Sequence, residues 1–198
     1  MNTLLFQCGH NEILFVLAFY AMTKNLPVTL VLFAGLFYFF RSPHHDHRSD
    51  VVTAPSYGTV QRIDGNRIEI ILNIFDVHIQ YIPYKGTVKS ITHFDGKLSP
   101  VLKDYFQKSD KNERCETVLG TSLGDIKVIQ YAGLVARRIY NNLKPKQSVQ
   151  QGDIMGMIKF SSRVDILLPK GVDILVKKGD KVKGAHTVLA VPKQQVFG

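Results

Sequence analysis

The segment Gly156–Asp165 reads Gly-Met-Ile-Lys-Phe-Ser-Ser-Arg-Val-Asp, an apolar strand pattern that ends in two serines, an arginine and an acid. Apolar residues predict a strand from Asp153 to Phe160, and Val164–Leu168 has the pattern of the next strand. Ser161 and Ser162 therefore fall where one strand gives way to another. On these residues alone, the serine pair is either an ordinary polar strand end or a reactive site.

Short β-branched segments separated by glycine turns continue on both sides of this stretch, and they are typical of antiparallel sheets. Ile63–Leu72 predicts a hairpin around Asp-Gly, and Ile126–Ala132 predicts the second strand of another hairpin. Within the soluble part, Ser99–Gln107 is the one helical pattern, because Ser-Pro is a good helix start. Residues 51–198 are therefore expected to form one mainly β domain, compact and antiparallel, with few helices.

Two apolar arms precede this domain, Ile13–Met22 and Pro27–Phe40, with Lys24 and Asn25 between them. Each arm is shorter than the roughly 20 residues that span a ~30 Å hydrocarbon core. A lysine at the centre of a span costs about 2.5 to 3.5 kcal/mol, so a shallow hairpin is favoured over one tilted span. We expect residues 1–41 to associate with a membrane and residues 42–50 to link them to a domain on the cytoplasmic side.

The charge of the chain, formally +9 over 198 residues, predicts an anionic partner. Lys and Arg are spread along the chain without a nucleic-acid-binding signature, so the sequence predicts no nucleic-acid partner. An anionic phospholipid membrane fits better, since each basic group near its surface adds about 1 kcal/mol of attraction. The run His44–His47 has no second ligand cluster to join it, and no metal site is expected.

Four further segments stand out in order: Phe39–Pro43, Phe75–Val88, Lys111–Arg114 and Ala132–Ile139. Together with Gly156–Asp165 they resemble motifs of the small phosphatidylserine decarboxylases. Those motifs are Phe-Phe-Arg-Asp-Pro, Asp-Val-His-Val-Asn-Arg-x-Pro-x-x-Gly-x-Val, Asn-Glu-Arg, Ala-Gly-x-x-Ala-Arg-Arg-Ile and Phe-Gly-Ser-Arg-Val-Asp. One such match is weak, but five in the same order over most of the chain are a specific signal.

The resemblance implies a self-processed enzyme that converts phosphatidylserine to phosphatidylethanolamine and carbon dioxide. In that family the chain is cut before a serine, which becomes a covalent pyruvoyl group, the electron sink for decarboxylation. Ser162 matches that serine, so the cut would fall between Ser161 and Ser162 and leave two chains that remain partners. The histidine of Asp-Val-His, which is His78 here, would serve as base and acid.

The resemblance also makes Arg137, Arg138 and Arg163 candidates for binding the substrate phosphate or carboxylate. Arg137 and Arg138 are consecutive, so on a strand they would point to opposite faces and at most one would reach a substrate. His78 also has a plainer interpretation, as a half-buried strand histidine bonded to a carbonyl group.

The chain departs from the family pattern at the reactive centre. Tyr57 replaces the aspartate of Ser-Pro-Ala-Asp-Gly, Ser161 replaces the glycine before the cut, and Gln80-Tyr81 replaces Asn-Arg. A neutral tyrosine cannot stabilise an imidazolium as a carboxylate does. Two alternatives therefore stay open. One is a non-catalytic lipid-binding relative, and the other is a lipoyl-like adaptor whose hammerhead halves would be Ala54–Val60 and Val176–Ala185.

Overall fold

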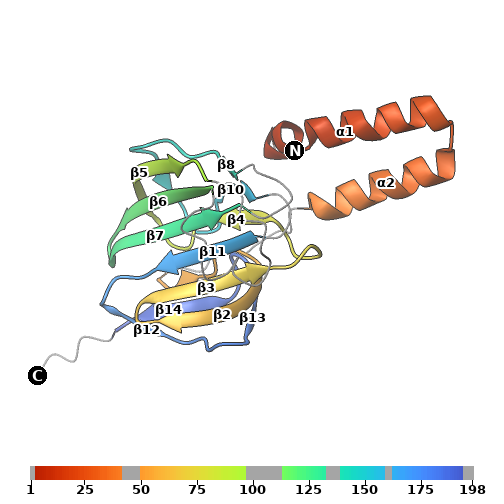
Figure 1. Ribbon diagram of the computed structural model, residues 1–198. Helices are drawn as coiled ribbons and strands as arrows, with labels where there is room; N and C mark the ends of the chain where they lie inside the picture. The colour runs from red at the N-terminus through yellow and green to blue at the C-terminus, as the bar shows by residue number, and fades with distance from the viewer. Residues whose placement is uncertain (1–2, 42–49, 97–112, 133–138, 159–161, 194–198) are drawn as a thin grey trace, which may run out of the picture. The chain divides into compact units, whose positions relative to one another are not determined.

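The computed structural model describes residues 3–41, 50–96, 113–132, 139–158 and 162–193. The chain divides into two compact units, residues 1–43 and residues 44–198. The described part of the first unit is helical, and that of the second is built from strands (Figure 1). This confirms the prediction of a mainly β protein with few helices.

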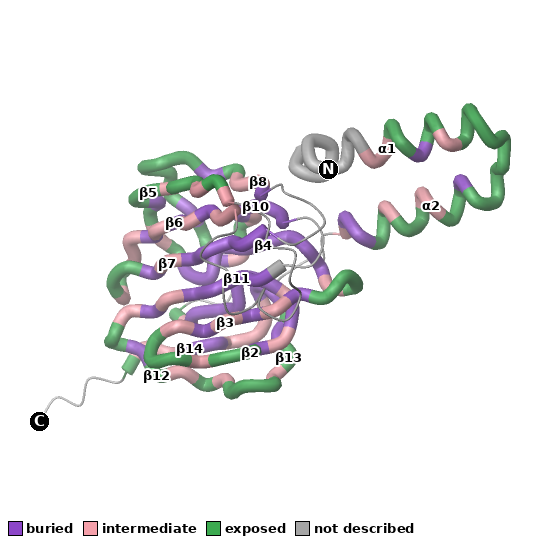
Figure 2. The backbone as a smooth tube through the Cα atoms, in the orientation of Figure 1, coloured by how far each residue is buried: buried purple, intermediate pink, exposed green. Residues whose placement is uncertain are grey.

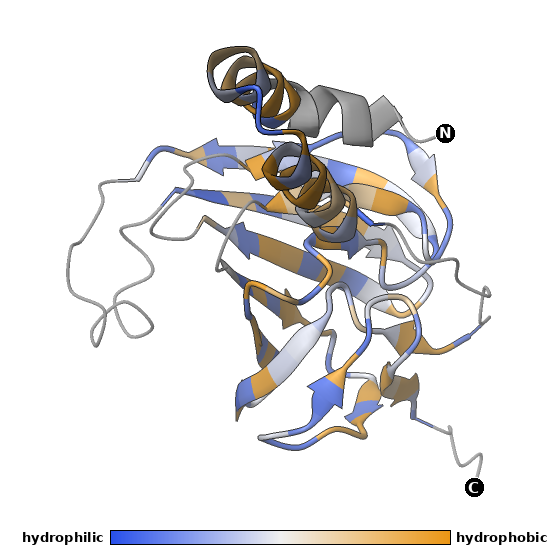
Figure 3. Ribbon diagram, turned by 90° about the vertical axis from the view of Figure 1, so that its right-hand side faces the viewer, coloured by the Kyte–Doolittle hydropathy of each residue, from blue (hydrophilic) through white to orange (hydrophobic). Residues whose placement is uncertain are grey.

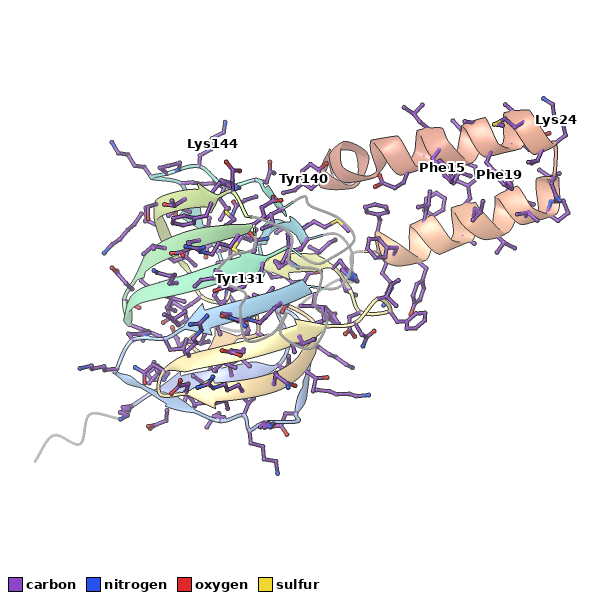
Figure 4. All side chains as sticks on the ribbon, in the orientation of Figure 1. Phe15, Phe19, Lys24, Tyr131, Tyr140 and Lys144 are labelled. Atoms are coloured by element: carbon purple, nitrogen blue, oxygen red, sulfur yellow. The ribbon has the colours of Figure 1, made fainter. Side chains whose placement is uncertain are left out.

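The described part of the N-terminal unit contains two helices, α1 (Thr3–Thr23) and α2 (Leu26–Phe39). Asn25 caps α2, because its side-chain oxygen accepts a hydrogen bond from the Val28 amide at 3.2 Å. Lys24 lies at the turn between the helices (Figure 4), and its φ of 53° is in the left-handed region. The chain therefore forms the expected hairpin, and a single continuous helix through this turn is excluded.

Large apolar side chains are exposed along both helices. Figure 3 shows how the hydrophobic residues are distributed along the described parts of these helices. Within the described residues, however, neither helix has the combination of length and apolarity needed to cross a bilayer. Contact of the hairpin with one leaflet stays a prediction.

The β unit is built on an eight-stranded antiparallel sheet with the strand order β13-β2-β3-β11-β7-β6-β5-β9. Its strands are β2 (Gly58–Asp64), β3 (Arg67–Leu72), β5 (Gly86–Phe94), β6 (Arg114–Thr121), β7 (Gly124–Tyr131), β9 (Ser148–Val149), β11 (Ser162–Leu167) and β13 (Lys181–Val182). β11 lies within the sheet, hydrogen-bonded to β3 on one side and to β7 on the other.

Two three-stranded sheets accompany it, with the orders β1-β14-β12 and β4-β10-β8. Their strands are β1 (Val52–Thr53), β4 (Ile79–Tyr81), β8 (Ile139–Asn141), β10 (Ile154–Ile158), β12 (Val172–Ile174) and β14 (Val188–Pro192). Leu189 of β14 and Met155 of β10 belong to the same buried cluster as Ile166 of β11. All three sheets therefore share one core, which Figure 2 shows as buried backbone in the middle of the β unit.

Glycine turns set the two hairpins that the sequence predicts. Gly65, with a φ of 56°, connects β2 to β3, and Gly124, with a φ of 112°, lies at the β6–β7 turn. Side chains other than glycine rarely adopt these angles, so the Asp-Gly and Leu-Gly-Asp signals identify real turns.

Sequence patterns did not predict β5, because only Val88 is buried along its nine residues. An apolar/polar alternation is therefore nearly absent, and pairing with β6 and β9 alone defines the strand. The helix predicted over residues 99–107 lies outside the described residues.

Candidate active site

His78 immediately precedes β4 and is fully buried. Its Nδ1 lies 2.8 Å from the carbonyl oxygen of Asp76. A carbonyl oxygen only accepts hydrogen bonds, so Nδ1 carries the proton, and in the neutral ring Nε2 is then the basic nitrogen. The His78 backbone oxygen accepts a hydrogen bond from the Ile158 amide at 3.2 Å, which ties His78 to the end of β10.

Ser162 is the first residue of β11, where it pairs with Leu72 at the end of β3. The chain thus leaves the β4-β10-β8 sheet at Ile158 and enters the eight-stranded sheet at Ser162. Four residue steps separate these positions, which limits their Cα separation to about 14 Å. The predicted cut falls in this crossing, next to the strand that His78 contacts, although Ser161 itself lies outside the described residues.

Gly156 lets β8 approach β10 closely at this place. A Cβ atom on Gly156 would lie 1.9 Å from the carbonyl oxygen of Tyr140, so only glycine fits beside this strand. The register places Gly156 opposite Gln80 on β4 and Asn141 on β8. A larger residue at position 156 would therefore displace the strand that leads to the cut.

Arg163 is buried in an ion cluster, which we define as Arg67, Glu69, Tyr131, Arg163 and Asp165. Nε and Nη2 of Arg163 donate to the two carboxylate oxygens of Asp165, each at 2.7 Å. Arg67 also donates to Asp165, and the Arg163 guanidinium lies 4.5 Å from the centre of the Tyr131 ring. Arg163 is 5% exposed and Asp165 is fully buried.

The electrostatics of this cluster keep Arg163 charged. Burial lowers the pKa of its guanidinium, but the hydrogen bonds and the negative charge of Asp165 raise that pKa by more. The guanidinium is thus engaged by protein carboxylates, and its predicted role in substrate binding stays a prediction. Arg137 and Arg138, the other two candidates, lie outside the described residues.

A second polar set, the amide chain of Gln80, Gln130 and Asn141, lies behind His78. Gln80 Nε2 donates to the His78 carbonyl oxygen at 2.8 Å and Gln130 Nε2 donates to Gln80 Oε1 at 3.0 Å. Asn141 Nδ2 then donates to Gln130 Oε1 at 3.2 Å. In the sequence, Gln80 stands out only as a departure from the family pattern, and no signal links it to Gln130 or Asn141.

Cys115 lies at the far end of the amide chain, 3.5 Å from Asn141 Nδ2. Burial raises the pKa of its thiol to about 11, and the hydrogen bonds from its neighbours offset only part of that effect. A thiol of this kind is protonated at neutral pH and is a poor nucleophile. The described residues contain no group of three or more His, Cys, Asp or Glu that could hold a metal ion, and His44–His47 lies outside them.

Tyr57 packs on a small apolar cluster formed by Val77, Ile79, Tyr81 and Ala185. The rings of Tyr57 and Tyr81 flank Gly184, where an added Cβ would lie 3.1 Å and 2.8 Å from them.

The backbone brings the same segments together, since the Tyr81 amide donates to the Pro55 carbonyl oxygen at 2.8 Å. The segments around Tyr57, His78 and Gly184, distant in sequence, therefore meet beside β4.

Comparison with known proteins agrees with this arrangement. A family model described as phosphatidylserine decarboxylase matches residues 36–190. The chain is 42% identical over 172 residues to a phosphatidylserine decarboxylase proenzyme of Streptomyces avermitilis, covering 84% of this chain and 78% of that protein. It is 38% identical over 169 residues to one of Mycobacteroides abscessus, covering 77% and 70%.

An archaeal protein of Methanococcoides burtonii, named putative archaetidylserine decarboxylase proenzyme, is 35% identical over 168 residues, covering 84% and 79%. The residues matched by the family model include the segments that hold His78 and Ser162. The chain therefore belongs to the phosphatidylserine decarboxylase family.

Proposed function

We propose that this protein is a phosphatidylserine decarboxylase that forms phosphatidylethanolamine and carbon dioxide by means of a pyruvoyl group made from Ser162. The observation that carries the proposal is the crossing from β10 to β11. It joins Ile158, which is hydrogen-bonded to His78, to Ser162 within four residues. The names of the relatives support the same activity.

Formation of the group begins at the Ser162 hydroxyl. Its oxygen attacks the carbonyl carbon of Ser161 while His78 Nε2 accepts the hydroxyl proton, and the Ser161–Ser162 peptide bond becomes an ester. Elimination breaks the ester, leaves a carboxylate on Ser161 and places a double bond in residue 162. Addition of one water and loss of one ammonia convert that residue to pyruvoyl, so atoms balance without an oxidant.

In catalysis, the pyruvoyl group supplies the electrophilic carbonyl that draws electrons from the bond to the departing carboxyl group. His78 holds the proton that replaces the carboxyl group on the substrate carbon. The Asp76 carbonyl fixes the ring orientation by binding Nδ1, and the fully buried position of His78 limits competition by water.

The two pieces are expected to stay associated after the cut. The C-terminal piece would contain β11, β12, β13 and β14, and β11 is paired on both sides with strands of the N-terminal piece. β14 is likewise paired with β1 of the N-terminal piece. The interface is thus the core of the domain, and the pieces should separate only in denaturant.

We place the enzyme at an anionic phospholipid membrane, with the β unit on the cytoplasmic side. The exposed apolar side chains of α1 and α2 support this placement, as does the net charge of +9. The apolar side chains concerned are Leu14, Phe15, Leu17, Tyr20, Met22, Leu26, Val28, Leu30, Val31, Phe37 and Tyr38.

A second candidate function is lipid binding without catalysis. The observation that favours it is the position of Tyr57, whose ring packs among apolar side chains where the family has an aspartate. Without a carboxylate there, an imidazolium on His78 is less stabilised and processing is slower. The two functions differ in whether the chain is cut.

The test is release of labelled carbon dioxide from carboxyl-labelled phosphatidylserine, with archaetidylserine, the lipid in the name of the Methanococcoides burtonii relative, as a second substrate. We expect turnover by the wild-type protein and a loss of about a thousandfold or more in Ser162→Ala and His78→Ala. Gln147→Ala, which changes an amide on the loop before β9, is the control and should retain activity. No release from either lipid by a processed wild-type protein would overturn the proposal.

A further inference from the structure

The turn between β3 and β4 carries two exposed apolar side chains. Ile74 is 54% exposed and Phe75 is 72% exposed. Among the described residues of the β unit, the only other large apolar side chain with this degree of exposure is Leu175, at 58%. Adjacent exposed apolar residues on a folded domain mark a surface for a partner or a membrane.

Hydrogen bonds within the turn hold it in shape. The Asn73 amide donates to Asp76 Oδ2 and the Phe75 amide donates to Asn73 Oδ1, both at 2.8 Å. The Asp76 amide donates to the Asn73 carbonyl oxygen at 3.1 Å. These three hydrogen bonds close the turn between Asn73 and Asp76, and the two apolar residues form its tip.

The same turn adjoins both proposed catalytic residues. Leu72, the last residue of β3, pairs with Ser162, and the Asp76 carbonyl oxygen binds His78 Nδ1. In Figure 1 this turn extends beyond the last residue of β3, at the end of the sheet where β11 begins. Whatever surface binds Ile74 and Phe75 therefore lies next to the reactive centre.

Two lysines provide positive charge at this end of the sheet. Lys181 of β13 pairs with Thr59 of β2, which in turn pairs with Ile71 of β3. Lys183 follows Val182, which pairs with Gly58. Gly58 is the first residue of β2 and lies at the same end of the sheet. Both lysine side chains are exposed.

We propose that this end of the eight-stranded sheet, with the β3–β4 turn and the two lysines, is a lipid-docking surface. Ile74 and Phe75 enter the interfacial layer of an anionic bilayer, and Lys181 and Lys183 contact lipid phosphates. The surface brings the head group to the reactive centre without removing the lipid from the membrane. The proposal rests on the proposed function for the identity of the lipid, but docking itself can be tested without catalysis.

An apolar tip beside basic side chains is the combination that binds interfaces rich in anionic lipid. It also accounts for the high exposure of Ile74 and Phe75 at this end of the sheet.

The chain contains no tryptophan, so Phe75→Trp introduces a single fluorescent reporter at the tip of the turn in the full-length protein. We expect its emission to shift to shorter wavelength when phosphatidylglycerol vesicles are added, and to be quenched by lipids brominated in the acyl chain. Leu175→Trp is the control, since Leu175 is another exposed apolar site of the β unit, at 58%, and its emission should not change. A bound protein whose Phe75→Trp emission stays constant, or shifts no more than that of Leu175→Trp, would overturn the proposal.

The second measurement compares vesicle binding by two double variants, each of which removes two lysine charges. Lys181→Gln/Lys183→Gln should weaken sedimentation with phosphatidylglycerol vesicles by about tenfold or more and reduce its salt dependence, since each lysine contributes about fivefold. Lys144→Gln/Lys170→Gln removes the same charge away from this edge and should change affinity by less than about twofold; Lys144 is labelled in Figure 4. Equal losses in the two double variants would indicate attraction by net charge alone and would contradict a defined surface.

The docking surface and the proposed function can fail separately. A Phe75→Trp signal on vesicles, in a protein that decarboxylates neither serine lipid, would leave the surface established and remove the enzymatic proposal. Decarboxylation without a change in Phe75→Trp emission would support the enzymatic proposal and remove the docking surface.

Discussion

The ion cluster and the amide chain are two buried polar sets on opposite faces of β7. Tyr131 belongs to the first and Gln130, its neighbour in sequence, belongs to the second. The ion cluster binds Arg163, next to Ser162, through full charges, whereas the amide chain binds the backbone of His78 through neutral groups. The chain therefore positions its two proposed reactive residues by different kinds of polar contact.

The difference matters because charges and amides respond differently to loss of a partner. A buried charge without its partner is destabilising by several kcal/mol, since desolvation is no longer offset. A buried amide without its partner costs only about 1–3 kcal/mol. Losing one partner in the ion cluster, next to Ser162, should accordingly reduce stability more than losing one partner in the amide chain behind His78.

Asp165→Asn is expected to have the largest effect. It keeps the shape of the side chain but removes the negative charge that Arg163 and Arg67 share, so the free energy of unfolding should fall by about 3–5 kcal/mol. Urea denaturation measures this change. The control is Asp125→Asn, since Asp125 pairs with Lys89 and both side chains are 54% exposed; its cost should be under about 1 kcal/mol. Equal losses in the two variants would show that the ion cluster has no special role.

Gln130→Leu should have an intermediate effect. Leucine has similar bulk but leaves Gln80 Oε1 and Asn141 Nδ2 without this partner, and we expect a loss of about 1–3 kcal/mol in urea denaturation. Processing at Ser162 should also slow, because Gln80 holds the His78 carbonyl. The comparison variant is Asn142→Leu, at an exposed amide, which should change stability by under about 0.5 kcal/mol. An unaltered processing rate in Gln130→Leu would separate the amide chain from the position of His78.

Glu116→Gln should change the free energy of unfolding least, and its effect should depend on pH. Burial raises the pKa of its carboxyl group, but hydrogen bonds from Arg114 and Lys127 lower it by more, so its folded-state pKa lies below the usual value of 4.5. Its contribution is present above that value and is lost as the pH falls through the lower folded-state pKa.

In Glu116→Gln, the dependence of stability on pH below about 4.5 should be shallower than in the wild-type protein, with a difference of about 0.5–1 kcal/mol at neutral pH. Stability curves measured between pH 3 and pH 7 test this. Superimposable acid limbs would mean that the carboxylate makes no net contribution.

Local sequence signals predicted the parts of the fold that depend on neighbouring residues. The Asp64-Gly65 turn identified the β2–β3 hairpin, and the segments around His78 and Ser162 indicated the family. β5 was missed because its side chains are mostly exposed. Arg163 was a substrate-binding candidate, yet it is bound by Asp165; pairing of β11 with β3 and β7 sets its surroundings, and this register is not visible in the sequence. The amide chain was missed for the same reason.

The central claim is that the chain is cut before Ser162, and the intact mass of the purified protein tests it most directly. We predict two species, Met1–Ser161 and a piece from residue 162 to Gly198 with a blocked N-terminus, that co-purify and separate in denaturant. Ser162→Ala should give one species with the mass of the whole chain, because alanine has no attacking oxygen. A wild-type protein that remains a single chain after prolonged incubation would contradict the pyruvoyl mechanism and favour the non-catalytic lipid-binding function.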